Sequence, residues 1–409
     1  MTMPAFDLTR GAMTGLKVVD LSRVLAGPLC TQMLADHGAD VVKIEPPAGD
    51  ETRGLGPPFD AAGQAAYFGA VNRGKQGMAL DLSRAEGRAV LEVLLGDADV
   101  LVENFLPGTM ERWGLGYEAA LATRFPRLIY CAISGFGADG PLGGLPGYDA
   151  VLQAMCGLMS INGTQESGAT RVGVPIVDYV TGYNALTGVL LALAARERTG
   201  TGQRIDVTLF DTALSLLVPY AANWICSGVV PGRLGSAHPN IAPYDKFSAS
   251  DGEIFLGILN DGQFGRFCQK VGRDDLLDDP RFRTNADRLS HVVALRAELE
   301  HTLAAFKSDD LCRELMRAGV PAGAVNTVSQ AFAQPHTVHR DMLVESDGHR
   351  APGIPVKLAQ TPGGARRRPP RFGEHAREIL TEAGFDQTAI EGLIETGIVT
   401  LQRKENAQR

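Results

Sequence analysis

Cysteine and histidine are scarce in this sequence, and neither residue is clustered. The six cysteines include no Cys-x-x-Cys pair, and the eight histidines show no spacing typical of metal ligands. A disulfide scaffold and a zinc site are therefore excluded, and we expect no metal. We expect a cytoplasmic protein whose cysteines stay reduced; they are Cys30, Cys131, Cys156, Cys226, Cys268 and Cys312.

Long apolar runs and an excess of positive charge are also missing. The longest apolar stretch, residues 185–195, contains Thr187 and Gly188 and falls short of the ~20 residues that span a bilayer. The first residues do not combine a basic region with an apolar run, so no secretory signal is predicted. Lys and Arg number 39 against 47 Asp and Glu, which gives a net charge of −8. We therefore expect neither a membrane nor a nucleic acid as partner.

The common nucleotide-binding and hydrolase motifs are also absent or incomplete. Gly135 to Gly140 matches G-x-G-x-x-G, but Pro141, Gly143 and Gly144 follow it. A dinucleotide fingerprint needs a helix there, so that its N-terminus can hold the pyrophosphate. The sequence has no phosphate loop, no G-x-S-x-G elbow and no H-E-x-x-H motif. Dehydrogenases, P-loop enzymes and common hydrolases are therefore not predicted.

What the first half does contain is an alternation of strand and helix patterns. Pro28 suits the first turn of a helix that runs to about His37, and Ser83 with Glu86 reads as a capping box for a helix to about Leu95. A Gly- and Pro-rich loop precedes the second helix, to about Gly77. Repeated β-α units predict an α/β fold with a mainly parallel sheet; the expected strands are 16–21, 39–45, 99–103, 128–133 and 204–210.

The pattern changes near residue 225, which predicts a second, smaller α+β domain over 225–325. Asp251-Gly252 reads as a hairpin turn, and helical patterns run from Gln263 to about Ala318. The segment 320–327 reads as the return to the first domain. The 409 residues thus divide into a large domain, residues 1–205 and 326–409, and the small domain, with linkers at about 206–224.

Asp178 is the acidic residue that stands out. It lies between apolar neighbours at the start of a strongly helical apolar segment, with no further carboxylate until Glu197. Free N–H groups and the helix dipole at such a position can keep a poorly hydrated carboxylate ionised. An ionised, poorly hydrated carboxylate is a plausible nucleophile toward an activated acyl carbon. From the residues alone, a plain helix cap remains the alternative interpretation.

Several ordered motifs then resemble one family, the class III CoA-transferases of the CaiB/BaiF type, to which formyl-CoA transferase belongs. The resemblance covers about residues 15–380. The matching stretches are 21–28, 38–45, 99–108, 128–137, the Asp178 segment, 196–203, 238–244 and 319–326.

The resemblance implies a Rossmann-like large domain, a small domain and two chains interlocked as a homodimer. It implies a CoA-transferase that moves CoA from an acyl-CoA donor to a small carboxylic acid. Our hypothesis for the donor is succinyl-CoA, and the acceptor acid stays open. In this family an aspartate, matched here by Asp178, attacks the donor thioester and carries the acyl group and then CoA. No metal is needed, because the thioester is already activated.

The resemblance also implies a set of CoA-contacting residues. They are Leu25, Ala26, Leu80, Asp81, Ser83, Asn104, Phe105, Arg112 and Tyr148. By charge alone, Lys43 and Lys75 are further phosphate candidates. Whether Arg171, Arg233 or His238 contacts substrate stays open.

Three departures from formyl-CoA transferase put formyl-CoA and oxalate specificity in doubt. Pro46 stands where that enzyme has a basic residue, Leu25 replaces a glutamine, and residues 229–235 lack its glycine run. Two other functions also compete. A 2-methylacyl-CoA racemase needs a Gly-His-Asp motif, but the chain has Tyr148 between Gly147 and Asp149, and a tyrosine with a pKa near 10 is a poor base. A non-catalytic CoA-binding protein is the third possibility.

Overall fold

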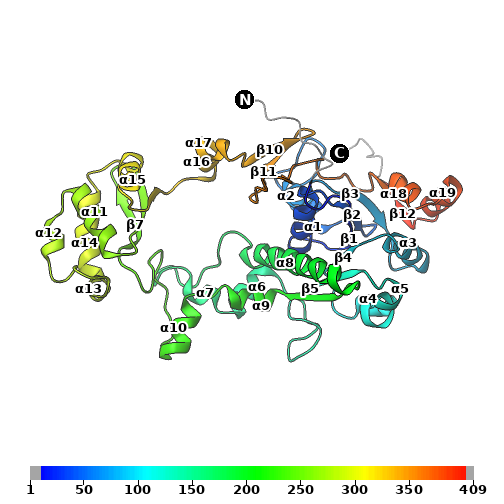
Figure 1. The fold of residues 1–409 in the computed structure, drawn as a ribbon, viewed down its shortest axis with the longest axis horizontal. Helices are drawn as coiled ribbons and strands as arrows, with labels where there is room; N and C mark the ends of the chain where they lie inside the picture. The colour runs from blue at the N-terminus through cyan, green and yellow to red at the C-terminus, as the bar shows by residue number, and fades with distance from the viewer. Residues whose placement is uncertain (1–10, 402–409) are drawn as a thin grey trace. The chain divides into compact units, whose positions relative to one another are not determined.

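The computed structural model describes residues 11–401, which form two compact units (Figure 1). Unit 1 comprises the described residues up to Cys156, Gly173–Leu216, and the described residues from Pro335 to Leu401. Unit 2 comprises Gly157–Val172 and Leu217–Gln334.

Unit 1 is built on a seven-stranded sheet in the order β12-β3-β2-β1-β4-β5-β6. All neighbours are parallel except β12, which pairs antiparallel with β3. The mainly parallel sheet is thus confirmed, and its order from β3 to β6 is that of the doubly wound nucleotide-binding folds. The strands are β1 (Lys17–Asp20), β2 (Asp40–Glu45), β3 (Gln76–Leu80), β4 (Val100–Glu103), β5 (Ile129–Ser134), β6 (Arg204–Thr208) and β12 (Val399–Thr400).

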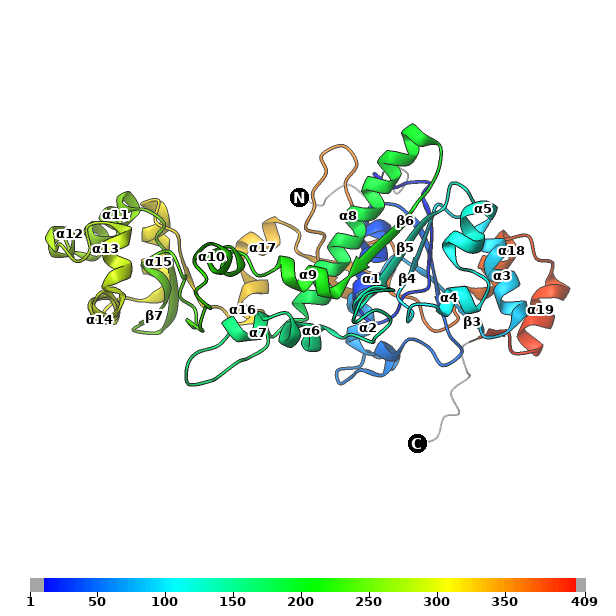
Figure 2. The ribbon, with the colours of Figure 1, turned by 90° about the horizontal axis from the view of Figure 1, so that it is seen from below.

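Helices cover both faces of this sheet (Figure 2). On one face Val19 and Leu21 belong to a buried apolar cluster that includes Leu91 and Ile379. The other face carries Asp20 and packs under α1, which lies along α8. The helices of unit 1 are α1 (Ala26–Asp36), α2 (Ala66–Ala70), α3 (Ala85–Leu95), α4 (Thr109–Arg112), α5 (Ala122–Arg124), α6 (Asp149–Met155), α8 (Ile176–Thr199), α9 (Leu209–Ser215), α17 (Pro335–His339), α18 (Ala376–Glu382) and α19 (Gln387–Glu395). A 3-10 turn at Glu51–Gly54, a π turn at Tyr117–Leu121 and the hairpin β10 (Leu343–Ser346) and β11 (His349–Pro352) complete it.

Unit 2 has its own core between a three-stranded antiparallel sheet and a layer of helices. The sheet order is β7-β8-β9, and Phe247, Leu256 and Phe267 lie in the core. The expected hairpin at Asp251-Gly252 is confirmed, because β7 pairs with β8 there. The elements are α7 (Leu158–Ile161), α10 (Tyr220–Ser227), β7 (Tyr244–Ala249), β8 (Gly252–Gly257), α11 (Asp261–Val271), α12 (Asp275–Asp278), α13 (Asn285–Ser290), α14 (Val292–Leu303), α15 (Ser308–Arg317), β9 (Ala322–Ala324) and α16 (Val328–Ala333).

The structure differs from the sequence-based expectations in four places. Residues 320–327 do not return to the large domain, because β9 pairs with β8 inside unit 2. Residues 157–172 also group with unit 2, where the Gly235 N–H donates to the Gly163 carbonyl. The Gly- and Pro-rich loop ends in β3, a strand that the pattern did not reveal. The Ser83 capping box does not form, because Ser83 donates to Asp81 instead.

Helix α8 is apolar enough, by length and composition, to pass for a membrane span. Its neighbours give another reason for that composition. It packs against α1, α6 and α9 and against strands β5 and β6. We therefore interpret α8 as a helix that packs within unit 1. Core helices of globular proteins are often apolar on most sides for the same reason.

Candidate active site

The candidate site lies where the strand order of the unit 1 sheet reverses. The chain leaves β1 toward β2 and β3, then returns to place β4 on the other side of β1. The carboxyl ends of β1 and β4 therefore diverge, and ligands of open α/β sheets bind in the crevice that results. The turn Ser22–Leu25 follows β1, and Asn104 and Phe105 follow β4.

A cavity of about 260 Å³ opens at this point, which we call the switch-point cavity. Asp178 from α8 reaches it together with residues of the β1, β4 and β5 turns. Its lining is Arg23, Val24, Leu25, Ala26, Glu51, Asn104, Phe105, Leu106, Pro107, Ile133, Ser134, Gly135, Leu145, Pro146, Gly147, Tyr148, Asp178 and Leu209. The predicted residues Leu25, Ala26, Asn104, Phe105, Tyr148 and Asp178 thus come together in space.

Glycine lets α8 bring Asp178 to this cavity. A Cβ at Gly182 would lie 2.8 Å from the Ala26 carbonyl oxygen, and one at Gly27 would lie 2.3 Å from the Ser22 side chain. Both distances are far below van der Waals contact. A larger residue at either position would push α8 or α1 away from the turn after β1. The helix that carries Asp178 can therefore lie directly against the start of α1.

The Asp178 carboxyl group is buried, with 9% of the residue exposed. The free N–H groups expected at its helix start are not free, because Asp149 Oδ2 accepts from the Val177 and Asp178 N–H groups at 2.7 and 3.3 Å. Burial, and then the negative charge of Asp149, raises the pKa of Asp178 to about 7. The helix dipole therefore does not keep this carboxyl fully ionised, contrary to the expectation from sequence.

This raised pKa predicts a pH dependence of catalysis if Asp178 acts as a carboxylate. The value of kcat/KM for acyl-CoA is expected to fall about tenfold per pH unit below a midpoint near 7, because only the ionised fraction reacts. Asp149→Asn removes a nearby negative charge and is expected to move the midpoint to lower pH. Steady-state rates between pH 5.5 and 8.5 measure both effects. A flat profile in the native enzyme would exclude Asp178 as the titrating nucleophile.

Asn104 has a role that the sequence did not suggest. Its Oδ1 accepts from the Arg23 N–H, and its Nδ2 donates to the Arg23 carbonyl, both at 2.8 Å. The Asn104 side chain, in the turn after β4, thus holds the backbone of the turn after β1. The contact crosses the point where the strand order reverses. We expected Asn104 to contact CoA, and it lines the cavity while fixing Arg23 in place.

A second cavity of about 340 Å³, the apolar slot, adjoins the first at Arg23, Phe105 and Leu106, which line both. The predicted residues Leu80, Asp81 and Ser83 lie here, and Phe105 stacks edge-on against Trp113 with ring centroids 5.2 Å apart. The slot is lined by Leu21, Arg23, Ile44, Glu45, Pro46, Pro47, Leu80, Asp81, Leu82, Ser83, Phe105, Leu106, Thr109 and Trp113.

The two lysine candidates for phosphate binding were predicted wrongly. Lys43 and Lys75 are fully buried, and their ammonium groups pair at 2.9 Å with Asp50 and Asp20, respectively. Neither lines the switch-point cavity or the slot. A lysine so deeply paired is a structural residue, because removing its partner would leave a buried charge.

The remaining candidates lie outside both cavities. Arg112 is exposed on α4 and donates to Thr109 Oγ1 at 2.8 Å, although Thr109 itself lines the slot. Arg171, Arg233 and His238 belong to unit 2. Among residues 11–401, no three His, Cys, Asp or Glu side chains are grouped so as to hold a metal ion.

Sequence reasoning missed two residues of the site, Arg23 and Asp149. Both residues lie in stretches that stand out in the sequence: Arg23 is inside a matched motif, and Asp149 directly follows Tyr148. The signal for Asp149 was available, because an acidic residue that begins a helix often accepts backbone N–H groups. Its partner N–H groups, however, belong to another helix 28 residues away, which no local pattern shows.

Comparisons with known proteins agree on one family. Residues 13–376 match the family described as CoA-transferase family III. The chain is 40% identical over 381 residues to the succinate–glutarate CoA-transferase of Agrobacterium fabrum, covering 90% of this chain and 95% of that protein. It is 42% identical over 352 residues to the acetyl-CoA:oxalate CoA-transferase of Acetobacter aceti, covering 86% and 90%. A solved structure of a CaiB/BaiF family protein from Brucella suis is 42% identical, with a TM-score of 0.83 over 91% of this chain and all of that chain.

Proposed function

Because this chain belongs to CoA-transferase family III, we propose that Asp178 is the carboxylate that carries first the acyl group and then CoA. The protein is an acyl-CoA:carboxylate CoA-transferase. The observation that supports the role of Asp178 is its place in the switch-point cavity, buried yet lining the space where a thioester can enter. A poorly hydrated carboxylate with a pKa near 7 is both available as an anion and reactive.

The chemistry balances with Asp178 alone as the covalent group. Its carboxylate attacks the thioester carbonyl of the donor, and CoA thiolate leaves, which forms a mixed anhydride. The thiolate then attacks the aspartyl carbonyl, which releases the donor acid and forms an aspartyl thioester. The acceptor carboxylate attacks that thioester and releases the thiolate again, forming a second anhydride. Attack of the thiolate on the acceptor carbonyl yields the new acyl-CoA and frees the Asp178 carboxylate.

The proposed substrates are succinyl-CoA as donor and a small dicarboxylic acid as acceptor. Support comes from the relatives, whose names include succinate, glutarate and oxalate. A dicarboxylate has one carboxylate to react with the aspartyl thioester and a second that a cation can hold. The second charge distinguishes such acids from monocarboxylates of the same size.

We also propose that the chain acts as a homodimer, interlocked as the family resemblance implies. Unit 2 exposes large apolar side chains near α10 that a partner chain would cover; they are Val218, Trp224, Ile225, Val229 and Val230. We propose the cytoplasm as its location, since all six cysteines are free and thiols stay reduced there.

A panel of acceptors tests the substrate proposal. Succinyl-CoA is incubated with acetate, propionate, oxalate, glutarate or no acid, and the CoA thioesters are followed by mass spectrometry. We expect one new thioester per succinate released, with kcat/KM for the preferred dicarboxylate at least about tenfold above that for the monocarboxylates, the value of one charge-assisted contact.

Two results of this panel would contradict the proposal. One is hydrolysis of succinyl-CoA without any new thioester. The other is preference for a monocarboxylate, which would leave the family activity intact but remove the dicarboxylate assignment. A separate incubation of the enzyme with a 2-methylacyl-CoA in deuterated water checks the racemase alternative, because a transferase adds no deuterium to the α-carbon of that thioester.

A further inference from the structure

The seam between the two cavities of unit 1 has one charged residue. Arg23, Phe105 and Leu106 are the residues that line both the switch-point cavity and the apolar slot. Phe105 and Leu106 are apolar, so Arg23 alone brings charge to this seam. Any ligand long enough to reach from the slot into the switch-point cavity must pass this guanidinium.

The chemical order of CoA matches the order of these cavities. CoA carries an adenine base at one end, a pantetheine thiol at the other, and a diphosphate between them. The slot, with Phe105 and Trp113 among its lining residues, suits a flat base, and the switch-point cavity contains Asp178, which must meet the thioester. The diphosphate then falls at the seam. We propose, resting on the proposed function, that Arg23 binds the diphosphate of CoA.

The Arg23 side chain has donors to spare for an anion. Its Nη1 donates to Glu51 Oε1 at 3.1 Å, in a pair whose side chains are 34% and 53% exposed. Such a pair holds weakly and can exchange its partner. The Arg23 Nε is buried and has no hydrogen-bond partner among the described residues. A guanidinium offers five donors in a planar fork that matches phosphate oxygens.

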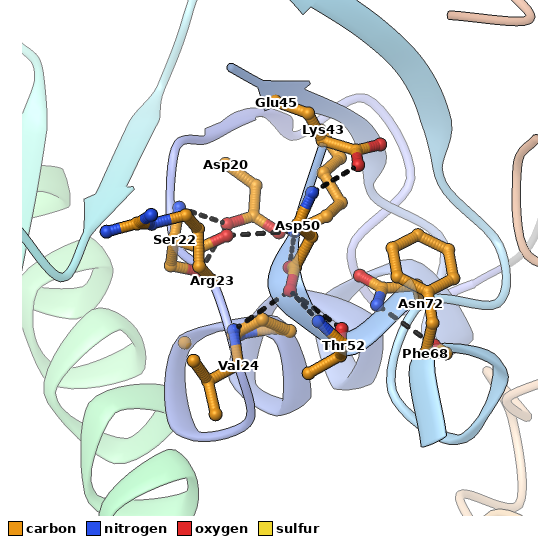
Figure 3. Close-up of polar contacts among 12 residues, drawn as sticks. Asp20, Ser22, Arg23, Val24, Lys43, Glu45, Asp50, Thr52, Phe68 and Asn72 are labelled. Atoms are coloured by element: carbon orange, nitrogen blue, oxygen red, sulfur yellow. Dashed lines mark hydrogen bonds and ion pairs between the residues drawn. The ribbon is translucent and has the colours of Figure 1, made fainter. Parts of the chain in front are cut away.

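The backbone that carries Arg23 is held from several sides (Figure 3). Asn104 clamps its N–H and carbonyl groups, as described above. On one side the Ser22 carbonyl accepts from the buried Lys43 ammonium at 2.8 Å, and the Ser22 N–H donates to Asp20. On the other side the Val24 N–H points to Asp50 Oδ1 at 3.5 Å. The turn is therefore fixed by groups on β1 and β2, by Asn104 directly after β4, and by Asp50 in a loop.

The backbone conformation of Val24 shows that these contacts hold the turn against the residue's own φ/ψ preference. Its φ is +69°, in the left-handed region that a β-branched residue rarely enters. Such a conformation persists only where the surroundings impose it, and it is concentrated at binding sites. Here the fixed turn places Arg23 at the seam. The backbone of this turn therefore loses little conformational entropy when an anion binds.

A comparison of two donors tests this role of Arg23. Succinyl-CoA has the diphosphate, whereas succinyl-pantetheine keeps the same thioester and lacks the whole 3′-phosphoadenosine diphosphate. Arg23→Ala is expected to raise KM for succinyl-CoA about 10- to 100-fold, the value of a charge-assisted hydrogen bond. The kcat/KM for succinyl-pantetheine should stay within about twofold of the native value. Arg23→Lys should restore part of the loss, because it keeps the charge but not the fork.

The control and the contrary outcomes separate this inference from the proposed function. Arg124→Ala removes an exposed arginine that pairs with Glu92 and should change neither donor's KM. An equal loss with both donors would contradict the inference, as would a rise in the acceptor KM alone, which would assign Arg23 to the acceptor carboxylate. If the native protein transfers CoA from no donor, the proposed function fails, and calorimetric titration of CoA into native and Arg23→Ala proteins still tests the contact.

Discussion

Asp178→Asn is expected to lower kcat for CoA transfer by at least about 10³-fold, as loss of a covalent nucleophile does in other enzymes. Asparagine has nearly the shape of aspartate but cannot form the anhydride or the aspartyl thioester. The Asp149 contacts to the α8 N–H groups do not involve the Asp178 side chain, so the helix start should stay as it is. The measurement is steady-state transfer from succinyl-CoA to the preferred acid.

The same variant should be more stable than the native protein at pH 8. Burial raises the pKa of Asp178 to about 7, so between roughly pH 4 and 7 the folded state binds a proton that the unfolded state has lost. The free energy of unfolding therefore falls as pH rises through this window, and asparagine avoids that loss. We expect the melting temperature of unit 1 to rise by about 5 °C at pH 8 and little at pH 5. An inactive variant with lower stability would indicate a damaged fold instead of a lost nucleophile.

Lys75→Met is expected to lower the free energy of unfolding of unit 1 by about 3–5 kcal/mol. The Lys75 ammonium donates to Asp20 Oδ2, to the Pro28 carbonyl and to Asn72 Oδ1, and none of it is exposed. Although burial disfavours the Asp20 carboxylate, Lys75 and Lys43 hold its pKa at about 2. The methionine would fill the space but leave that carboxylate short of a partner in a buried site.

Two further variants identify the cause of this loss. Adding Asp20→Asn to Lys75→Met removes the uncompensated charge and should recover part of the stability. Lys17→Met is the matched control, because Lys17 lies on the same strand as Asp20 but is its exposed first residue and pairs with Asp97; its cost should stay below about 1 kcal/mol. Urea denaturation measures all three. If Lys75→Met lowers the free energy of unfolding no more than Lys17→Met does, the buried Lys75–Asp20 pair does not stabilise unit 1 as proposed.

The sequence predicted the strands of unit 1 better than it predicted the partners of the charged residues on them. Strands 16–21, 39–45 and 99–103 were recognisable because each contains a short run of valine, isoleucine or leucine, and these strands form the centre of the sheet. By charge alone Lys43 is a phosphate candidate, although its alternation with Val42 and Ile44 puts its side chain on the face of the sheet that carries Asp20. That face is covered by α1, which only the tertiary packing reveals.

Two strands that the sequence did not predict consist of residues with little strand propensity. The strand β9 is Ala-Gly-Ala, which has little strand propensity and forms only because β8 offers an edge. The strand β3 begins amid glycines and is likewise fixed by its neighbour β2. The clamp between Asn104 and Arg23 joins residues 81 positions apart. Contacts of this kind depend on the strand order, which no pattern within a short window contains.

The most direct measurement is chemical trapping of the activated Asp178 carboxyl group, because hydroxylamine displaces the acyl group or CoA from it and leaves a hydroxamate. Native enzyme is mixed with succinyl-CoA, quenched with hydroxylamine and digested, and the peptide that contains Asp178 is examined by mass spectrometry. We expect a hydroxamate at Asp178 in the native enzyme and none in Asp178→Asn. Turnover at the normal rate with residue 178 unmodified, or a hydroxamate on another carboxyl group, would contradict this expectation.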